Sequence, residues 1–368
     1  VQESMSEKVV RGPKEGFVET IAVNIALIRR RIQDPQLKVK IFKLGKRSKT
    51  KVAILYIEDI AKEEVIAEVE KRIGAVDIDL IHDSSTIEAF IEDNPFSIFP
   101  QVLPTERPDK VAANLAEGRI AIIADGSPSV LIVPVTLATI FQSPEDYYER
   151  FIFGTLVRIM RFGVFTIATT LPALYVAMVS FHHQLIPDRL ILTLAMGRLL
   201  VPFPAFIEAL AMEITIELLR EASSRLPGLL GQTIGVVGGL VLGQAAVSAK
   251  LASPAMVIVV ALTAIATFTV PNYSLSYPLR LIRFPMMILA GGFGFFGIFL
   301  VWMALIIHLS SLESFGTPYF SPIAPLRFSE MKDTMFRFPI WVMRKRPSSP
   351  GTIDEIRTKG KKGDDSIG

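Results

Sequence analysis

The sequence predicts an α/β cytoplasmic domain over residues 1–150, an α-helical polytopic membrane domain over residues 151–312 and a cytoplasmic C-terminal segment over residues 313–368. Two observations lead to this division. The mean hydropathy of +0.44 is high for a soluble chain of this length. Lys and Arg number 39 and Asp and Glu number 36, yet only 12 of these charged residues lie between positions 162 and 312. A single soluble fold would spread its charges more evenly, so we expect a membrane block between two charged regions.

The first 150 residues predict alternating helices and strands. Residues 20–31 have helical periodicity and end in three arginines, residues 51–57 form an apolar strand, and residues 63–73 form a charged amphipathic helix. The apolar runs 119–124 and 130–135 are separated by Asp-Gly-Ser-Pro, which is typical of a hairpin turn. The pattern therefore favours an α/β domain.

Four charge-free apolar stretches follow, and each is longer than the roughly 20 residues that a helix needs to cross a bilayer. They are residues 162–187, 226–249, 251–279 and 284–312. A short helix that begins near Ser143 leads into the first of them. Soluble cores rarely contain one such run, so four of them predict four full spans.

The stretch between the first and second spans has a different pattern. Residues 191–207 are apolar apart from Arg198, but Pro202 and Pro204 interrupt them. Irregular backbone at membrane depth is tolerated only where it is buried in protein or faces water. We therefore predict a broken or re-entrant piece followed by an amphipathic helix over about residues 205–223. A further full span over residues 191–207 is the alternative.

Basic residues on both sides of the membrane block predict its orientation. Arg150, Arg158 and Arg161 precede the first span, and a basic cluster over residues 337–346 follows the last one. Because loops rich in Lys and Arg stay on the cytoplasmic side, both terminal regions of this multi-pass protein are expected in the cytoplasm. Arg280 and Arg283 would lie outside in this scheme and mildly oppose it.

The two ends of the chain are polar. Residues 1–16 contain no apolar core of a secretory signal, so we expect the internal apolar segments to direct membrane insertion. Residues after about 347 are rich in Ser, Gly, Lys and Asp, which predicts a disordered basic tail.

Composition and motifs exclude several classes of function. The absence of cysteine excludes disulfides and Cys-based metal or redox sites, and a net charge of +3 argues against nucleic-acid binding. The basic loop over residues 45–50 has one glycine where a phosphate-binding loop needs two. His182 and His183 have no third ligand nearby and are better explained as polar rings at the membrane boundary. We expect neither enzyme activity nor a cofactor or metal.

Glycine recurs at every fourth position in one apolar stretch. In lipid, small residues let helix backbones approach closely, because packing rather than the hydrophobic effect drives their association. The pattern predicts a helix-packing face at Gly231, Gly235, Gly239 and Gly243.

The other side of the same helix carries polar and valine side chains. A turn of about 100° per residue places Thr233, Val237, Val241, Gln244 and Ser248 away from the glycines. One interpretation is interhelical hydrogen bonding. The other is a pore in which Thr, Gln and Ser rings are wetted and Val rings form constrictions. These five residues are the pore-lining candidates.

The amphipathic helix predicted over about residues 205–223 carries several carboxylates. Glu208, Glu213 and Glu217 predict the wet, acidic face of an interfacial helix. The alternative is a cation-attracting vestibule or an interhelical ion-pair network with Arg198, Arg220 or Arg225.

A series of short sequence blocks occurs in a fixed order across residues 9–346. The blocks are residues 10–17 (VRGPKEGF), 24 (N), 27–32 (LIRRRI), 48–50 (SKT), 202–208 (PFPAFIE), 231–240 (GQTIGVVGGL), 243–247 (GQAAV) and 314–320 (SFGTPYF). In these blocks and in their order the sequence resembles the GerA family of spore-germination proteins, and the length of the ordered match makes the resemblance specific.

The resemblance implies an A-type subunit of a nutrient germinant receptor in the inner membrane of an endospore. Its implied partners are a B-type, transporter-like subunit that senses the nutrient and a C-type lipoprotein. The resemblance also implies a homo-oligomer, with a pentamer as the expected form, that acts as a ligand-gated cation channel. Full-length relatives carry an additional N-terminal α/β subdomain, so residues 1–150 are expected to be the second half of a longer region.

Two other functions remain open from the sequence. One is a membrane scaffold that assembles transporter-like and lipoprotein partners without conducting ions. The other is a secondary transporter that uses the broken segment near Pro202 and Pro204 as a substrate site. Ion flux separates a channel from a scaffold, and saturable uptake identifies a transporter.

Overall fold

The computed structural model describes residues 3–4, 7, 9–226, 229–328 and 330–358. The chain divides into two compact units. The first contains Val1–Met160 together with His308–Gly368, and the second contains Arg161–Ile307. Each unit is described separately below.

The first unit is built on a five-stranded sheet in which every neighbouring pair is antiparallel. Its strands, in spatial order, are β1 (Leu37–Leu44), β2 (Thr50–Ile57), β4 (Ile120–Ala124), β5 (Val130–Val133) and β3 (Leu103–Thr105). The predicted hairpin is present, because β4 pairs with β5 across the Asp-Gly-Ser-Pro turn. The α/β class predicted for this part of the chain is therefore confirmed.

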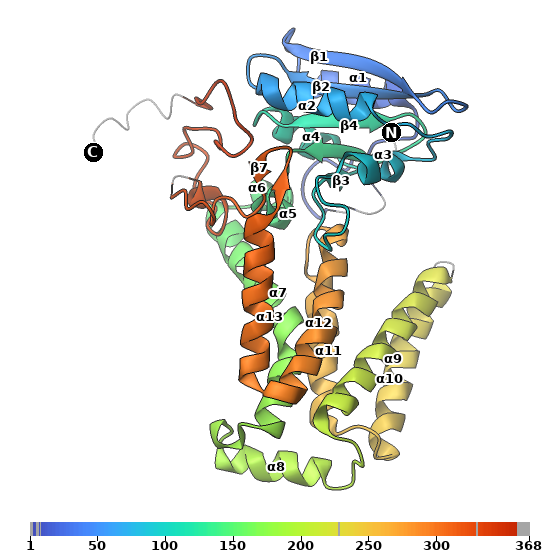
Figure 1. Cartoon of the computed structure of the whole chain (residues 1–368), viewed down its shortest axis with the longest axis vertical. Coiled ribbons are helices and arrows are strands. Elements are labelled where there is room, and N and C mark those ends of the chain that lie inside the picture. Colours follow the sequence, from blue (N-terminus) through green and yellow to red (C-terminus); the bar gives the residue numbers. More distant parts are fainter. Residues whose placement is uncertain (1–2, 5–6, 8, 227–228, 329, 359–368) are drawn as a thin grey trace. The chain divides into compact units, whose positions relative to one another are not determined.

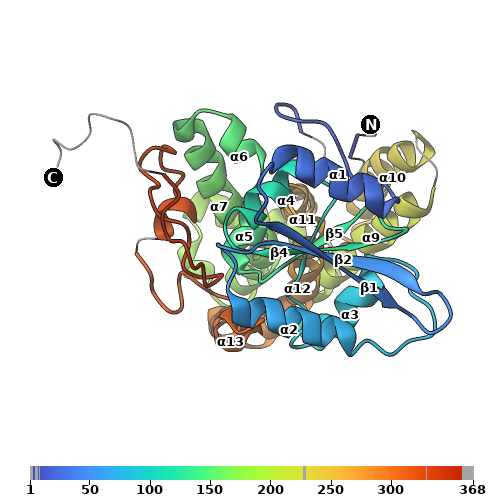
Figure 2. The same ribbon diagram turned by 90° about the horizontal axis from the view of Figure 1, so that it is seen from above.

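Helices cover both faces of this sheet. Figure 2 shows α1 (Ile21–Arg31) and α4 (Pro108–Leu115) on one side and α2 (Glu63–Gly74) and α3 (Ser84–Ile91) on the other. Because β2 lies between these layers, its side chains from Val52 to Ile57 are all buried. In contrast, β1 is an edge strand and leaves Ile41 exposed.

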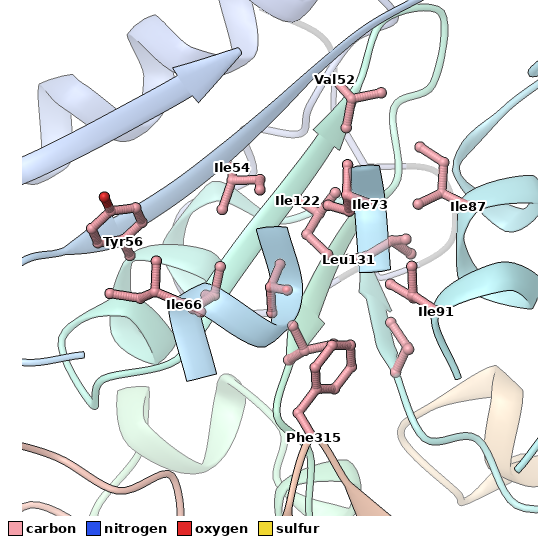
Figure 3. Packing of buried hydrophobic residues seen from close by; sticks show 14 of the residues in the cluster. Val52, Ile54, Tyr56, Ile66, Ile73, Ile87, Ile91, Ile122, Leu131 and Phe315 are labelled. Atoms are coloured by element: carbon pink, nitrogen blue, oxygen red, sulfur yellow. The ribbon is translucent and has the colours of Figure 1, made fainter. Parts of the chain in front are cut away.

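The main hydrophobic core lies between the sheet and the α2–α3 layer. Side chains alternate along a strand, so Val52, Ile54 and Tyr56 of β2 share one face (Figure 3). They pack with Ile73 of α2 and with Ile91 of α3 in the same cluster.

A residue from the far end of the chain joins this core. Phe315 lies between two short strands, β6 (Glu313–Ser314) and β7 (Thr317–Pro318), and its side chain is buried with the core residues (Figure 3). The Arg72 guanidinium lies 4.3 Å from the centre of the Phe315 ring. The Ser314 hydroxyl donates to the carbonyl of Gln101 at 2.8 Å and accepts from the amide of Val135 at 3.0 Å. The segment after residue 312 is therefore part of the first unit.

The C-terminal segment is ordered further than the sequence predicted. Instead of becoming disordered after residue 347, it folds back, and the amide of Ile353 donates to the carbonyl of Ile60 at 2.9 Å. The Arg346 side chain also donates to the carbonyl of Ala116 at 2.9 Å. Polar composition alone did not reveal these long-range contacts, and residues 359–368 lie outside the described part.

Two short helices connect the sheet to the apolar part of the chain. They are α5 (Leu137–Phe141) and α6 (Glu145–Tyr148), and α7 (Phe151–Ser180) begins immediately afterwards. The division between the two units falls within α7 and again within α13.

The described residues of the second unit form helices and no strands (Figure 1). After α7 come η1 (His183–Leu185), α8 (Asp188–Arg198), α9 (Ala205–Arg225), α10 (Leu229–Ser248), α11 (Pro254–Phe268), α12 (Tyr273–Phe293) and α13 (Phe295–Ser311). The predicted break around Pro202 and Pro204 is present between α8 and α9.

The four predicted spans correspond only in part to these helices. Among the described residues, α7 is the one helix long and apolar enough to cross a membrane, and Val237–Ser248, Pro254–Phe268 and Phe295–Ser311 are shorter apolar helices. The prediction of one continuous span over residues 284–312 is wrong. Gly294 has a φ of 60°, a left-handed conformation that ends α12, and α13 begins at the next residue. The count of four complete spans remains a prediction.

Glu88 gives the first unit a pH-dependent stability. Burial, followed by repulsion from Glu92 and Asp83, raises the pKa of this α3 carboxyl from 4.5 to about 7. A raised folded-state pKa favours the neutral form, so this contribution to stability is present below about pH 4.5 and is lost as the pH rises through about 7.

Glu88→Gln keeps the side chain neutral at every pH. We expect it to raise the free energy of unfolding by about 1–3 kcal/mol above pH 7 and to change it little below pH 4.5. The measurement is denaturant unfolding of the full chain in detergent at both pH values. Glu63→Gln on the exposed side of α2 is the control. Parallel pH profiles for the wild type and Glu88→Gln would contradict this account.

Candidate functional site

The glycine row of α10 is in close contact with α9. A Cβ atom at Gly231 would lie 2.5 Å from the carbonyl oxygen of Ser223, and one at Gly235 would lie 3.3 Å from its hydroxyl. At Gly238, a Cβ would lie 2.9 Å from a methyl carbon of Leu219. The missing side chains therefore let the backbones of this hairpin approach each other.

The other end of the row has different neighbours. A Cβ at Gly243 would make an ordinary contact, 3.6 Å from Val257 of α11. A Cβ at Gly239 would meet no atom within 4 Å. Thus the first two glycines of the row contact α9, Gly243 faces α11, and Gly239 leaves an open notch between them.

The valine and polar side of α10 is exposed in the chain. Val237 and Val241 are 51% and 54% exposed, and Gln244 and Ser248 are also exposed. These four positions fall within a stripe about 60° wide on the helical wheel. The side chain of Thr233, the fifth candidate, lies outside the described residues. The structure brings the four described candidates together on one uncovered side of α10.

Glu208, in the first turn of α9, connects three helices. Its side chain is 1% exposed, and one of its oxygens accepts hydrogen bonds of 2.6 Å from both the amide and the hydroxyl of Ser253. Ser253 caps the N-terminus of α11, where the helix dipole favours a negative charge. The other oxygen of Glu208 is 3.1 Å from the guanidinium of Arg198 in α8.

Glu213 forms a buried ion pair with Arg283 of α12. Glu213 is 1% exposed and Arg283 is fully buried. The same guanidinium donates to the hydroxyl of Thr267 on α11, which in turn donates to the carbonyl of Thr263 at 2.9 Å. A charge at this depth requires such pairing, because an isolated one would lose its hydration.

Glu217 is the third member of the series and is partly exposed. It accepts a 2.9 Å hydrogen bond from Arg280 of α12 and one of 3.3 Å from Arg220 of its own helix. The Arg220 guanidinium also lies 5.3 Å from the centre of the Phe268 ring. Glu208, Glu213 and Glu217, with their arginines, are called the ion-pair ladder below.

The ladder bears on the two alternatives that the sequence left open for these carboxylates. Burial of Glu208 and Glu213 does not fit a wet face, whereas pairing with Arg198, Arg280 and Arg283 of other helices fits an interhelical network. Sequence reasoning missed Arg280 and Arg283 as partners, because 63 and 70 residues separate them from their carboxylates. The sequence did contain a signal for this pairing. Glu213 and Glu217 are four residues apart and Arg280 and Arg283 are three apart, so each pair lies on one face of its helix.

A cavity of about 480 Å³ lies in the first unit, between α5 and the C-terminal segment. Several of its charged side chains pair with one another, as Arg119 does with Glu117 at 2.9 Å and Lys345 with Glu355 at 3.0 Å. Within the described ranges no group of three His, Asp or Glu side chains could hold a metal ion. The loop over residues 45–50 forms the turn between β1 and β2, where Ser48 donates to the carbonyl of Leu44 at 3.4 Å.

Comparisons with known proteins identify relatives of the whole chain. The family model described as Bacillus/Clostridium GerA spore germination protein matches residues 1–349. The chain is 48% identical over 359 residues to spore germination protein B1 of Bacillus subtilis (strain 168), which is 98% of this chain and 74% of that protein. It is 47% identical over 363 residues to the uncharacterized membrane protein YfkQ of the same strain, which is 99% of this chain and 70% of that protein.

The comparisons also include a solved structure. It is the N-terminal domain of the A subunit of the Bacillus megaterium spore germinant receptor GerK3, with 42% sequence identity and a TM-score of 0.28. The match covers 33% of this chain and 95% of that domain.

The contact between α9 and α10 predicts different effects at two glycines. Gly231→Ala places a methyl group against backbone and should cost about 1–3 kcal/mol through overpacking. Gly239→Ala is the matched control and should change stability by less than about 1 kcal/mol, in the favourable direction, because alanine is the better helix former. Thermal unfolding of the full chain in detergent, followed by circular dichroism, measures both. Equal losses at the two sites would contradict the packing described.

The buried ion pair makes a second prediction. Arg283→Met leaves Glu213 buried without its cation and should cost about 3–5 kcal/mol. The double variant Glu213→Leu with Arg283→Met should lose less than the single one, because no uncompensated charge remains. Glu221→Gln, which breaks an exposed pair with Arg225, is the control and should cost less than about 1 kcal/mol. Additive losses in this unfolding cycle would show that the two charges do not depend on each other.

Proposed function

Since the chain belongs to the GerA family of Bacillus/Clostridium spore germination proteins, we propose that it is the A-type subunit of a nutrient germinant receptor and forms a ligand-gated cation channel as a homo-oligomer. The observation that carries the channel proposal is the uncovered stripe of Val237, Val241, Gln244 and Ser248 on a helix packed from behind through glycines. A pentamer is the proposed form.

The chemistry of the stripe favours water over lipid. An amide such as Gln244 facing hydrocarbon would have no hydrogen-bond partner, and this costs several kcal/mol. When copies of α10 gather around an axis, Gln244 and Ser248 form wetted rings. Val237 and Val241 form apolar rings that exclude water when narrow, and widening them admits ions.

The rest of the second unit supplies the support for such a ring. The glycine row brings α9 close behind α10, and the ion-pair ladder ties α9 to α8, α11 and α12. A shift of α9 must carry α10 with it, because their backbones are in contact at Gly231. We propose that nutrient binding elsewhere in the receptor moves the pore helix through this connection.

The family membership and the charge pattern support a proposed location and proposed partners. The proposed site is the inner membrane of the spore, with both terminal regions in the cytoplasm, which requires an even number of crossings. The proposed partners are membrane lipid, a B-type transporter-like subunit and a C-type lipoprotein. No catalytic role, cofactor or nucleic acid is part of this proposal.

Ion flux from vesicles containing the full chain tests the pore. Val237→Ala should widen the constriction and increase potassium leakage without nutrient, whereas a bulkier Val237→Phe should reduce any basal flux. Leu242→Ala is the matched control, because Leu242 is also an exposed apolar residue of α10 but lies on the far side of the helix from the stripe.

Three results would contradict the channel. Unchanged leakage in both Val237 variants favours the non-conducting scaffold. An equal effect of Leu242→Ala indicates general damage to the helix. Saturable, stoichiometric uptake by the isolated subunit favours the secondary transporter.

A further inference from the structure

Exposed apolar side chains cluster in the C-terminal segment of the first unit. Within residues 336–342, five of the seven side chains are apolar and between 38% and 54% exposed; they are Phe336, Phe338, Ile340, Trp341 and Val342. Soluble surfaces rarely carry so continuous an apolar run, and larger apolar patches mark contact with protein or membrane.

Arg337 fixes the direction in which these side chains point. Its amide donates to the Thr155 hydroxyl at 3.1 Å, and that hydroxyl donates to the Arg337 carbonyl at 3.0 Å. The buried guanidinium donates to the carbonyls of Glu149 at 2.7 Å and Tyr147 at 3.1 Å. Arg337 is only 5% exposed, whereas its two phenylalanine neighbours, Phe336 and Phe338, both face outward.

A second anchor holds the segment to the same helix. The fully buried Arg158 of α7 lies 2.9 Å from a carboxylate oxygen of Asp333, and the Tyr147 hydroxyl donates to the other oxygen at 2.9 Å. Asp333 before Phe336 and Arg337 after it are therefore both fixed against the first turns of α7.

The length of α7 indicates how deep its first turns lie in the bilayer. Its 30 residues extend about 45 Å, whereas the hydrocarbon core is about 30 Å thick. Residues 162–187 carry no charge, so the hydrocarbon begins after Arg161 and the turns around Thr155 lie at the level of the lipid head groups. Ile152, Phe153 and Leu156 are exposed on these same turns.

A loop around Phe96, which contacts the end of α13, also exposes apolar side chains. The Ser97 hydroxyl lies 3.0 Å from the His308 imidazole, one turn before the end of α13, and the Phe99 ring lies 6.1 Å from it. Phe96, at the tip of this loop, is 95% exposed and Ile98 is 40% exposed. This second contact thus lies where α13 ends, as the first lies where α7 begins.

We propose that residues 336–342 and the Phe96 loop are seated in the head-group layer of the adjacent bilayer leaflet, so that the first unit rests on lipid at two points. Trp and Phe favour this layer because their rings are apolar and tolerate its polarity. The exposed Lys332 and Arg344 flank the first contact and attract anionic head groups. The inference requires α7 to be in the membrane and does not depend on ion conduction.

Trp341 is a natural probe, because the chain contains two tryptophans and the other is Trp302 in α13. The full-length Trp302→Phe variant is reconstituted in phosphatidylcholine–phosphatidylglycerol vesicles with a nitroxide quencher on the head group or deep in the acyl chain. We expect the head-group quencher to reduce Trp341 emission more than the deep one. A second probe, Phe96→Trp in a chain without other tryptophans, should behave in the same way.

Two controls separate the possible outcomes. Trp341→Phe leaves Trp302, which should be quenched mainly by the deep label and so reports the insertion of α13. Ile41→Trp, on the exposed edge strand of the sheet, should be quenched by neither lipid label.

Two results for Trp341 would overturn the proposal when Trp302 is quenched normally. Access to aqueous acrylamide without lipid quenching would place the segment in water. Protection from every quencher would place it against a second copy or another protein. Failure of Trp302 quenching would instead refute membrane insertion, and the channel proposal with it.

Discussion

The ion pair between Glu213 and Arg283 is the contact on which the arrangement of the second unit most depends. Both side chains are buried among apolar helices, so neither charge can turn to water if the other is withdrawn. The pair therefore fixes α9 against α12. The same guanidinium also donates to the hydroxyl of Thr267, which connects α11 to the pair. Because α10 is packed on α9 through glycine, its orientation follows from that of α9, and the stripe at Val237 and Val241 is left uncovered.

The first unit has a comparable constraint in its core. Phe315, which follows the last apolar helix, is buried between the sheet and α2 under the guanidinium of Arg72. The chain thus leaves this unit within α7 and returns to it within α13, at His308. At the start of α7, Arg158 pairs with Asp333 and Arg337 donates to the carbonyl of Glu149. After α13, the Ser314 hydroxyl bridges the backbone of Gln101 and Val135. The segments that precede and follow the apolar block therefore belong to the same sheet domain.

The sequence identified those elements whose side-chain pattern is strong. The amphipathic residues of α2 and the apolar strands β2, β4 and β5 were predicted within one or two residues of their observed ends. It missed β1, whose edge position leaves lysines alternating with apolar residues such as Ile41, so the strand carries no continuous apolar signal. It also missed α3 and α4, because helices of 8 residues are too short to show a full hydrophobic period.

The same contrast holds for the candidate site and for the chain as a whole. Composition and spacing alone determined that residues 162–312 carry few charges and that glycines recur every fourth residue in one helix. They also determined that valine, glutamine and serine share the other side of that helix, because these are local properties of the order of residues. Only the tertiary structure decided which groups meet. It paired Glu213 with Arg283, divided the last apolar stretch at Gly294, and returned Phe315 to the sheet, because each of these depends on parts of the chain that packing, not sequence proximity, brings together.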